Sequence, residues 1–453
     1  MKIVVCGAGR IGKNIVSYLS QGNNDISVID NDQRHLDEIA KEWDVLPVLG
    51  SASHPEILEK AGAMNADLIL AVTNVDEVNM IACQVADYLF HVRKKIARID
   101  SKDFMDPLWC ELYNEKNIPL DLMISPDIEI AKAIYSIIKI PGTSSVMPLY
   151  DNKIFLLSIR CQENCPLFKV PLNHIEMVAP ELRISLVSIV RQGKNFIPGP
   201  DFMLEEGDEV YFLVEEKQID DAVHTFGMDK PSNEKVVIFG GNLISQFLAK
   251  KLGKDDSISS CKIIDEDSTS AKHLARILDN TTIIYGEMMS DIILDEAGVN
   301  TADVTVSATL RDKDNLLASL ISRKNGARST ISLVNSRAYS TLVSNFSDSI
   351  VVDSSSVTVS AILKELRKAK IRQAYSLGRG FGEVWEIKID ENSPIIDKKI
   401  IELEIPDNSK VCAICRGEII IYPTLYDKIY EGDNVILFSS SKAIRKVEKI
   451  FSR

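Results

Sequence analysis

The sequence predicts an α/β protein in which one unit occurs twice in tandem, each copy consisting of a parallel-sheet domain and a small β-rich domain. Segments of the first half recur in the second half in the same order. The pairs are Gly50–Gly62 with Gly286–Gly298, Ala66–Asn79 with Ala302–Asn315, and Leu204–Leu213 with Ile429–Phe438. Their first residues lie 236, 236 and 225 positions apart (286 − 50, 302 − 66 and 429 − 204). A shift this constant indicates a duplication.

Short apolar runs alternate with segments of helical periodicity in the first part of each half. Ile11, Ile15, Val16 and Leu19, for example, share one face of a helix. Strands that alternate with helices are typical of a doubly wound parallel sheet with right-handed crossovers, a Rossmann-like arrangement. The strands expected in the first half are Lys2–Cys6, Ser27–Asp30, Leu46–Leu49, Leu68–Thr73, Lys95–Ile99 and Leu122–Ser125.

A small β-rich domain of the α+β type is expected after each Rossmann-like domain. Its strands are expected in "KIFLLSIRC" and "SLVSIVRQGKNFIPGPDFMLEEGDEVYFLV" in the first half and in "GEVWEIKI" and "VCAICRGEIIIYPTLYDKIYEGDNVILF" in the second. The paired "EGD" turns at Glu206–Asp208 and Glu431–Asp433 each lead into a strand. We expect Asp208 and Asp433 to be ordinary turn residues.

The domain boundaries follow from the segments between these elements. Helical linkers are expected at Asp127–Lys139 and Val357–Lys370, and the polar segment Gly227–Lys235 is expected to separate the halves. We therefore expect Rossmann-like domains at residues 1–126 and 233–353, and β-rich domains at residues 140–226 and 372–453.

Composition and charge exclude several classes of protein. Of the 453 residues, 45% are hydrophobic and 26% are charged, as in ordinary soluble proteins. The net charge of −13 argues against a nucleic-acid partner. No apolar run approaches the roughly 20 residues that span a bilayer. Because the start has no basic stretch followed by an apolar one, we expect no signal peptide and a cytoplasmic location.

The cysteines do not predict a metal site. The eight cysteines are scattered, which suits a reduced compartment. Cys412 and Cys415 lie in a strand-like stretch, so residues three apart are expected on opposite faces, where they could not share a metal. Cys161 and Cys165 form an equally isolated pair. We expect no metal site.

A glycine fingerprint opens the first half. Gly7, Gly9 and Gly12 form G-x-G-x-x-G between a predicted strand and a predicted helix, and Asp30 ends the second strand. Gly7 would permit the tight turn, Gly9 the close approach of a pyrophosphate, and Gly12 close packing of helix and sheet. The helix N-terminus would bind the phosphates. Asp30 would accept hydrogen bonds from ribose hydroxyls, and its charge argues against NADP.

Other polar residues follow strands at the same edge of the sheet. Arg10 could contact the far phosphate of NAD, ATP or ADP, or be a solvated surface residue. Thr73 and Asn74 are candidates for ligand contact, whereas Asp76, Glu77 and Asn79 could instead cap the next helix. Arg98 could reach the phosphates or an adjacent subunit, or form a plain salt bridge.

The second half keeps only part of this fingerprint. Gly240 and Asp265 are retained, but Asn242 and Ser245 replace the second and third glycines. Asparagine tolerates left-handed backbone, yet its side chain would occupy space that a pyrophosphate uses. Ser245 would loosen the packing of helix against strand. We expect a weakened or differently selective site.

The sequence does not predict an enzyme or any catalytic residue. A dehydrogenase needs an acid–base group beside its nicotinamide, and the six histidines are scattered without a catalytic arrangement. We expect the β-rich domains to bind a ligand or support assembly. An NAD-dependent oxidoreductase remains an alternative.

The sequence resembles the TrkA family, cytoplasmic regulators of potassium uptake built from two RCK (regulator of potassium conductance) N and C modules. The resemblance rests on "KIVVCGAGRIG", on "VID" ending at Asp30, on "ILEKAGAMNADLILAVTNVDEVN" and on the paired "EGD" turns. It implies a homo-oligomeric ring at the inner face of the cell membrane, bound to a potassium-translocating subunit of the TrkH/TrkG type. It also implies gating by NAD(H) and by ATP or ADP.

The resemblance also implies which residues bind the nucleotide. The implied residues are Gly7, Ala8, Gly9, Arg10, Ile11, Gly12, Asp30, Thr73, Asn74 and Arg98 in the first half, with Gly240 and Asp265 in the second. Gly50-Ser51 departs from the Gly-Asp that is frequent in the family and removes a carboxylate expected near the adenine. A nucleotide sensor for a different cation transporter is the other alternative.

Overall fold

The structure is a computed structural model with two compact units. It describes residues 1–20, 24–101, 103–105, 112–113, 117–162, 165–228, 234–336, 339, 349–366, 371–377 and 381–451. Unit 1 contains residues 1–129 and 355–366, and unit 2 contains residues 130–354 and 367–453. The expected seam at Gly227–Lys235 and the end of the expected linker at Val357–Lys370 lie partly outside the described residues.

Unit 1 is built on a six-stranded sheet with the strand order β3-β2-β1-β4-β5-β6. All neighbouring strands pair in parallel, which confirms the predicted doubly wound sheet. The strands are β1 (Lys2–Cys6), β2 (Asp25–Asp30), β3 (Leu46–Leu49), β4 (Leu68–Ala71), β5 (Lys94–Arg98) and β6 (Leu122–Ile124). All six predicted strands are present, with boundaries that shift by up to two residues.

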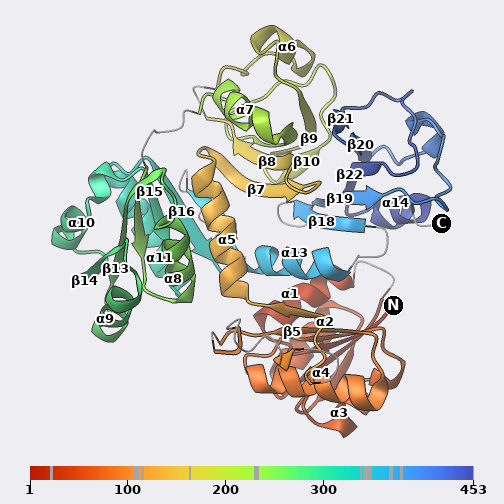
Figure 1. The fold of residues 1–453 in the computed structure, drawn as a ribbon, viewed down its shortest axis with the longest axis vertical. Helices are drawn as coiled ribbons and strands as arrows, with labels where there is room; N and C mark the ends of the chain where they lie inside the picture. Colours follow the sequence, from red (N-terminus) through yellow and green to blue (C-terminus); the bar gives the residue numbers. More distant parts are fainter. Residues whose placement is uncertain are drawn as a thin grey trace. The chain divides into compact units, whose positions relative to one another are not determined.

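Helices cover both faces of this sheet (Figure 1). They are α1 (Arg10–Leu19), α2 (Gln33–Glu42), α3 (Pro55–Lys60) and α4 (Asp76–Phe90). Alternate residues of each central strand enter two different cores because both faces are buried. Val5 packs with Ile15 of α1 on one face, whereas Cys6 packs with Cys83 of α4 on the other.

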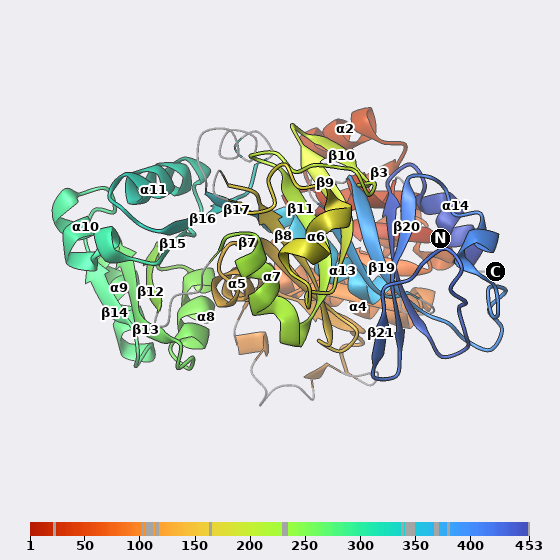
Figure 2. The same ribbon diagram turned by 90° about the horizontal axis from the view of Figure 1, so that it is seen from above.

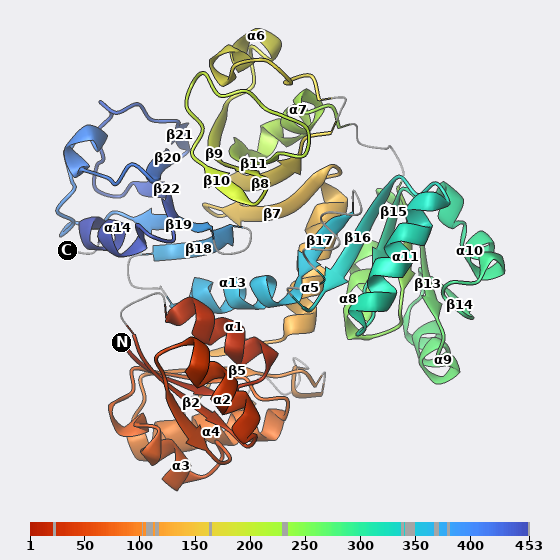
Figure 3. The same cartoon turned by 180° about the vertical axis from the view of Figure 1, so that it is seen from behind.

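A helix from the second half completes the first of these cores. Helix α13 (Ser354–Leu366) is the linker of the second half, and most of it belongs to unit 1. Its Val359 and Ile362 are 7% and 1% exposed and belong to one cluster with Ile11 and Ile15. Figure 3 shows α13 beside α1. The first Rossmann-like domain therefore buries a helix that is distant in sequence.

The second Rossmann-like sheet lies in unit 2 and repeats the order of the first, β14-β13-β12-β15-β16-β17. Figure 2 shows α11 on one face and α8 on the other. The strands are β12 (Glu234–Phe239), β13 (Ile258–Asp265), β14 (Thr282–Tyr285), β15 (Val304–Ser307), β16 (Ser329–Val334) and β17 (Ile350–Asp353). The helices are α8 (Leu243–Leu252), α9 (Ser268–Ile277), α10 (Asp291–Ala297) and α11 (Asp312–Lys324).

The linker of the first half, α5 (Pro126–Lys139), contacts this second domain through its C-terminal part. Asp255 accepts hydrogen bonds from the Tyr135 hydroxyl at 2.7 Å and from Lys139 Nζ at 3.0 Å. Burial alone would raise the pKa of Asp255, but hydrogen bonds from Lys139, Tyr135 and Ser257 outweigh it and hold this pKa well below its ordinary value. Asp255 is therefore a charged anchor for α5.

The two β-rich domains have matching antiparallel sheets. Their strand orders are β10-β9-β11-β8-β7 and β21-β20-β22-β19-β18, which correspond strand by strand. The first contains β7 (Thr143–Leu149), β8 (Ile154–Arg160), β9 (Ile184–Arg191), β10 (Lys194–Phe196), β11 (Glu209–Glu215), α6 (Ile175–Val178) and α7 (Ile219–Thr225). The second contains β18 (Ile371–Leu377), β19 (Gly382–Lys388), β20 (Ser409–Arg416), β21 (Ile419–Ile421), β22 (Asn434–Ser440) and α14 (Ile444–Phe451).

The two β-rich domains share a hydrophobic core within unit 2. Leu156 and Leu213 of the first sheet belong to one buried cluster with Val384 and Phe438 of the second. At its edge the carboxylate of Glu386, which is 1% exposed, accepts the N–H of Tyr150 at 2.9 Å. This joint core indicates that the two β-rich domains stabilise each other.

The expected placement of Cys412 and Cys415 on opposite faces of their strand is wrong. Cys412 and Cys415 do not face opposite ways: a bulge between Val411 and Ala413 shifts the alternation, and both cysteines enter the same core. Their burial raises their thiol pKa values to about 11 and about 12. Nearby carboxylates, Glu386 among them, raise the pKa of Cys415 further, and such raised values suit structural thiols.

The aspartates of the "EGD" turns are not ordinary turn residues. Asp208 and Asp433 are both fully buried, and each forms a two-pronged ion pair with an arginine on a neighbouring strand. The Arg191–Asp208 bonds measure 2.8 and 2.7 Å, and the Arg416–Asp433 bonds measure 2.8 and 2.9 Å. The sequence pattern shows the turn but not the arginine 17 residues earlier that neutralises its carboxylate.

No helix in the described ranges is long and apolar enough to cross a membrane. Within the same ranges, no group of three or more His, Cys, Asp or Glu side chains could hold a metal ion.

Candidate nucleotide-binding site

The loop between β1 and α1 has the geometry that its glycines predict. Gly7 has a φ of +106°, and its N–H donates to the Ile29 carbonyl at 2.7 Å. A Cβ on Gly12 would lie 1.8 Å from the Gly7 carbonyl oxygen, so only glycine allows α1 to pack this closely. Around Gly9, by contrast, no atom of the described residues beyond its neighbours in the chain lies within 4 Å of the Cβ position. The loop is thus tight at two glycines and open at the third.

The open position lies at the N-terminus of α1. The first helical hydrogen bond runs from the Lys13 N–H to the Gly9 carbonyl at 2.8 Å. The amides that precede Lys13 have no acceptor within the helix, and they carry the positive end of its dipole. A phosphate placed beside Gly9 would accept hydrogen bonds from these amides.

Asp30 lies directly beneath the loop. Its Oδ2 accepts the Ala8 N–H at 2.6 Å, and its Oδ1 accepts the Asp32 N–H at 2.8 Å. Each carboxylate oxygen can accept two hydrogen bonds, so Asp30 could still bind ribose hydroxyls. His35 of α2 also approaches Asp30, with 3.5 Å between Nδ1 and Oδ1. The sequence does not single out His35, because one histidine in an amphipathic helix carries no signal of its own.

At the end of β4, the polar residues serve mainly to fix the backbone. Asn79 is fully buried. Its Oδ1 accepts the Thr73 N–H at 3.0 Å and the Thr73 hydroxyl at 2.7 Å, and its Nδ2 donates to the carbonyls of Thr73 at 3.0 Å and Arg98 at 2.9 Å. Asn79 therefore joins the ends of β4 and β5, and it uses the Thr73 hydroxyl to do so. Asn74 is exposed beside this network.

Asp76 does not cap the helix that follows β4, which was the role considered for it. Val75 occupies the N-cap of α4 without a side-chain capping bond. The Asp76 carboxylate instead accepts the N–H groups of Asp100 at 3.0 Å and Ser101 at 2.8 Å, in the loop after β5. Asp76 thus fixes the start of α4 to the neighbouring loop.

A cluster of charges lies at this edge of the sheet. Arg98 forms a two-pronged ion pair with Asp100, at 3.1 and 2.5 Å. Asp127, in the first turn of α5, lies near both. Burial raises the pKa of Asp127 and the charge of Asp100 raises it further, whereas Arg98 and Arg10 lower it. The cluster therefore brings Arg10 and Arg98 into one electrostatic environment, with Asp127 as a member that the sequence analysis did not single out.

Ser51, which stands where a carboxylate was expected near the adenine, forms a hydrogen bond with the hydroxyl of Ser53. Ser51 Oγ lies 2.9 Å from Ser53 Oγ. Gly50 before it has a φ of +147°, and its N–H donates to the Asp30 carbonyl at 2.9 Å. The loop after β3 thus adjoins Asp30 and offers hydroxyl groups there in place of a carboxylate.

The second Rossmann-like domain repeats this framework. Gly240 has a φ of +94° and donates its N–H to the Ile264 carbonyl at 2.9 Å. Asn315 is fully buried and binds Thr309 as Asn79 binds Thr73, at 2.8 and 2.7 Å. Asp265 again follows the second strand of its domain and is 7% exposed. The two domains therefore share one backbone design and differ in the loop that would hold phosphate.

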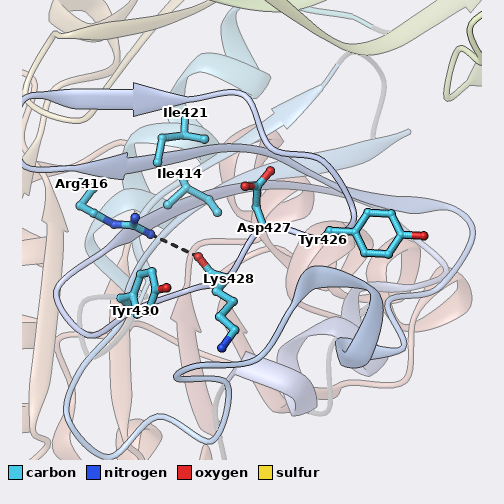
Figure 4. A pocket seen from close by; sticks show the side chains of 7 residues that line it. All are labelled: Ile414, Arg416, Ile421, Tyr426, Asp427, Lys428 and Tyr430. Carbon is cyan, nitrogen blue, oxygen red and sulfur yellow. Dashed lines mark hydrogen bonds between the residues drawn. The ribbon is translucent and has the colours of Figure 1, made fainter.

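The second β-rich domain contains an open hollow of about 320 Å³ (Figure 4). Its principal polar side chains already have partners: Arg416 pairs with Asp433, and Asp427 accepts the Thr424 N–H at 2.7 Å. Figure 4 also shows the bond from Arg416 to the Lys428 carbonyl, at 3.2 Å. These contacts stabilise the loop that lines the hollow.

Comparison with known proteins agrees with this architecture. The TrkA-N domain model matches residues 3–125 and 236–371, and the TrkA-C domain model matches residues 156–227 and 384–452. The Trk system potassium uptake protein TrkA of Azorhizobium caulinodans is 31% identical over 451 residues, covering 100% of this chain and 98% of the relative. TrkA of Haemophilus influenzae is 31% identical over 455 residues, with the same coverage.

Solved structures show the same fold. The crystal structure of the GsuK RCK domain matches with a TM-score of 0.61 at 16% identity, covering 99% of this chain and 94% of that one. The structure titled "GsuK channel bound to NAD" also has a TM-score of 0.61 at 16% identity, covering 100% of this chain and 79% of that one.

The duplicated Rossmann-like and β-rich domains define a tandem two-domain repeat whose first half has a glycine loop of the dinucleotide-binding pattern. The matches of both domain models in both halves, together with full-length relatives, are more specific. The chain belongs to the TrkA family.

Proposed function

We propose that this protein is the nucleotide-responsive regulatory subunit of a potassium uptake system. In this proposal NAD(H), ATP or ADP binds in the first Rossmann-like domain and alters a homo-oligomeric ring. The ring acts at the cytoplasmic face of the cell membrane on a potassium-translocating subunit of the TrkH/TrkG type. The full-length relatives, which are named potassium uptake proteins, support the choice of partner.

One observation carries the nucleotide part of this proposal. The open backbone at Gly9 lies between the N-terminal amides of α1 and the Asp30 carboxylate. Phosphates favour helix N-termini, and a carboxylate after the second strand favours ribose hydroxyls. The full-length relatives are named potassium uptake proteins, so we infer that the nucleotide acts as an effector and is not consumed.

Regulation requires that the nucleotide bind one state of the ring better than another. A shift from 1:99 to 99:1 takes about 5.5 kcal/mol of differential binding free energy. Sites coupled across several identical chains could supply this sum together. We therefore expect the response to nucleotide to be steeper than one-site binding when the ring is intact.

The test is calorimetric titration of the full chain with NADH, NAD, ATP and ADP. Asp30→Ala should abolish or strongly weaken binding, whereas Asp25→Ala, at an exposed position on the same strand, should leave it unchanged. The same variants should then be assayed for potassium uptake with the membrane subunit. Nucleotide control that survives in Asp30→Ala, after binding has been lost, would refute the proposal.

A further inference from the structure

We propose that the second Rossmann-like domain is closed to dinucleotides by its own Asn242, whose carboxamide takes the place of a phosphate. The chain would then hold a single dinucleotide site, the one in the first domain. This inference rests on the proposed function of that first site.

The two loops differ at the position that matters for phosphate. Gly9 and Asn242 both stand three residues after the end of the first strand of their domain, β1 or β12. Gly9 offers open space, because no described atom beyond its neighbours in the chain lies within 4 Å of its Cβ position. Asn242 has an extended backbone, with φ −78° and ψ −174°, so it is not there for a left-handed turn. The contacts of its side chain, and not its backbone conformation, therefore explain why an asparagine stands at this position.

Both ends of the Asn242 side chain are engaged within the domain. Its Oδ1 accepts the Ser245 N–H at 3.2 Å, which is a bond from the N-terminal turn of α8. Its Nδ2 donates to the Ala308 carbonyl, just beyond the end of β15, at 2.5 Å. A phosphate at a helix N-terminus would accept a hydrogen bond from the same kind of amide. Asn242 therefore occupies the phosphate position and spans the opening between α8 and β15.

The carboxylate for the ribose is closed off as well. Asp265 Oδ1 accepts the Asp267 N–H at 3.2 Å, as Asp30 Oδ1 accepts the Asp32 N–H. Its Oδ2, however, is buried and has no hydrogen-bond partner among the described residues. A Cβ on Gly241 would lie 2.1 Å from this oxygen, so the loop lies directly over it. Ribose hydroxyls could reach Asp265 only if the loop moved.

The experiment is a reciprocal exchange measured by calorimetric titration of the full chain with NADH and ATP. The natural chain should bind one ligand per chain. Gly9→Asn should abolish binding, because the new carboxamide has room to close the first loop. Asn242→Gly together with Ser245→Gly restores the glycine pattern, and it should raise the ratio to two. The combination of all three changes should return the ratio to one, with the ligand now in the second domain.

The outcomes separate this inference from the proposed function. A ratio of two in the natural chain, or a ratio that stays at one in the restored variant, would overturn the inference and leave the first site intact. Absence of binding in the natural chain, followed by one ligand in the restored variant, would refute the proposed first site and support closure by Asn242. Absence of binding in both would refute both ideas.

A folding control accompanies each variant. Glycine is tolerated at helix N-caps, so Asn242→Gly alone should keep the thermal transition within a few degrees. Asn242→Ala removes the carboxamide but keeps a small side chain at the same position. The second site of Asn242→Ala should therefore bind NADH at least about tenfold more weakly than that of Asn242→Gly. Equal affinity in the two variants would contradict a phosphate-sized opening.

Discussion

Replacement of Asn79 by alanine should both destabilise the first Rossmann-like domain and weaken nucleotide binding. The side chain is fully buried and makes four hydrogen bonds, which use both acceptor positions of its oxygen and both of its N–H donors. Alanine would leave the Thr73 amide and the carbonyls of Thr73 and Arg98 to find other partners, whereas the Thr73 hydroxyl could still donate to the Val75 carbonyl at 3.2 Å. Because Thr73 abuts the Gly7 turn, the loop should lose its support as well.

The magnitude follows from the three groups that lose their partner. Each buried polar group left without a partner costs about 1–3 kcal/mol, and local relaxation with entry of water reduces the sum. A loss of about 3–4 kcal/mol from the free energy of unfolding is therefore expected. In a unit of this size, that loss corresponds to a fall of roughly 10 °C in the melting temperature.

The assay is urea and thermal unfolding followed by circular dichroism, together with titration of NADH. The chain supplies its own control, because Asn315→Ala removes the same network from the second Rossmann-like domain. Asn79→Ala should lower the transition of unit 1 and the NADH affinity, whereas Asn315→Ala should lower the transition of unit 2. A loss of less than about 1 kcal/mol for Asn79→Ala would refute the argued role of the buried amide.

Three further predictions concern the loop, a buried ion pair and pH. Gly12→Ala should cost at least about 1–3 kcal/mol, because its Cβ would lie 1.8 Å from a loop carbonyl; Gly9→Ala should be nearly neutral in urea unfolding, and equal losses would contradict the packing argument. Arg191→Met should cost about 3–5 kcal/mol by leaving Asp208 buried without its cation, and an unchanged urea midpoint would oppose this. Burial tends to raise the pKa of Asp255, but hydrogen bonds from α5 and Ser257 outweigh it and lower this pKa in the folded state. The stability that the ionised carboxylate contributes is fully present above the unfolded pKa of about 4 and is lost as the pH falls below it. Asp255→Asn should therefore show a smaller drop in melting temperature between pH 7 and pH 3 than the natural chain, and an identical drop would show that Asp255 is not the titrating group.

The parts of the fold that could be predicted depend on neighbours in sequence. Parallel strands that are buried on both faces form continuous apolar runs, so β1 is evident from Lys2–Cys6 alone. The Gly7 and Gly12 positions are predictable because backbone geometry admits no larger residue there. The duplication extends the strand and Gly7 predictions to the second half, where Gly240 also has a positive φ, but Ser245 replaces the equivalent of Gly12.

The parts that could not be predicted depend on contacts between distant residues. Asn79 reaches a carbonyl 19 residues away, and nothing near it in sequence indicates that partner. The bulge at Cys412 reverses the alternation on which the placement of Cys415 depended. The same holds for α13: its apolar face predicts burial but not which surface covers it.

The packing of α13 against the first Rossmann-like domain bears on how the chain is made. The ribosome completes the first six strands early, yet Val359 and Ile362 are synthesised only after residues 130–354. Until then the apolar side chains of α1 that later meet α13 remain open to water, to chaperones and to proteases. Expression of the two halves as separate polypeptides would leave the same surface open in the first of them. The nascent chain must therefore keep an unfinished domain soluble while more than two hundred further residues emerge.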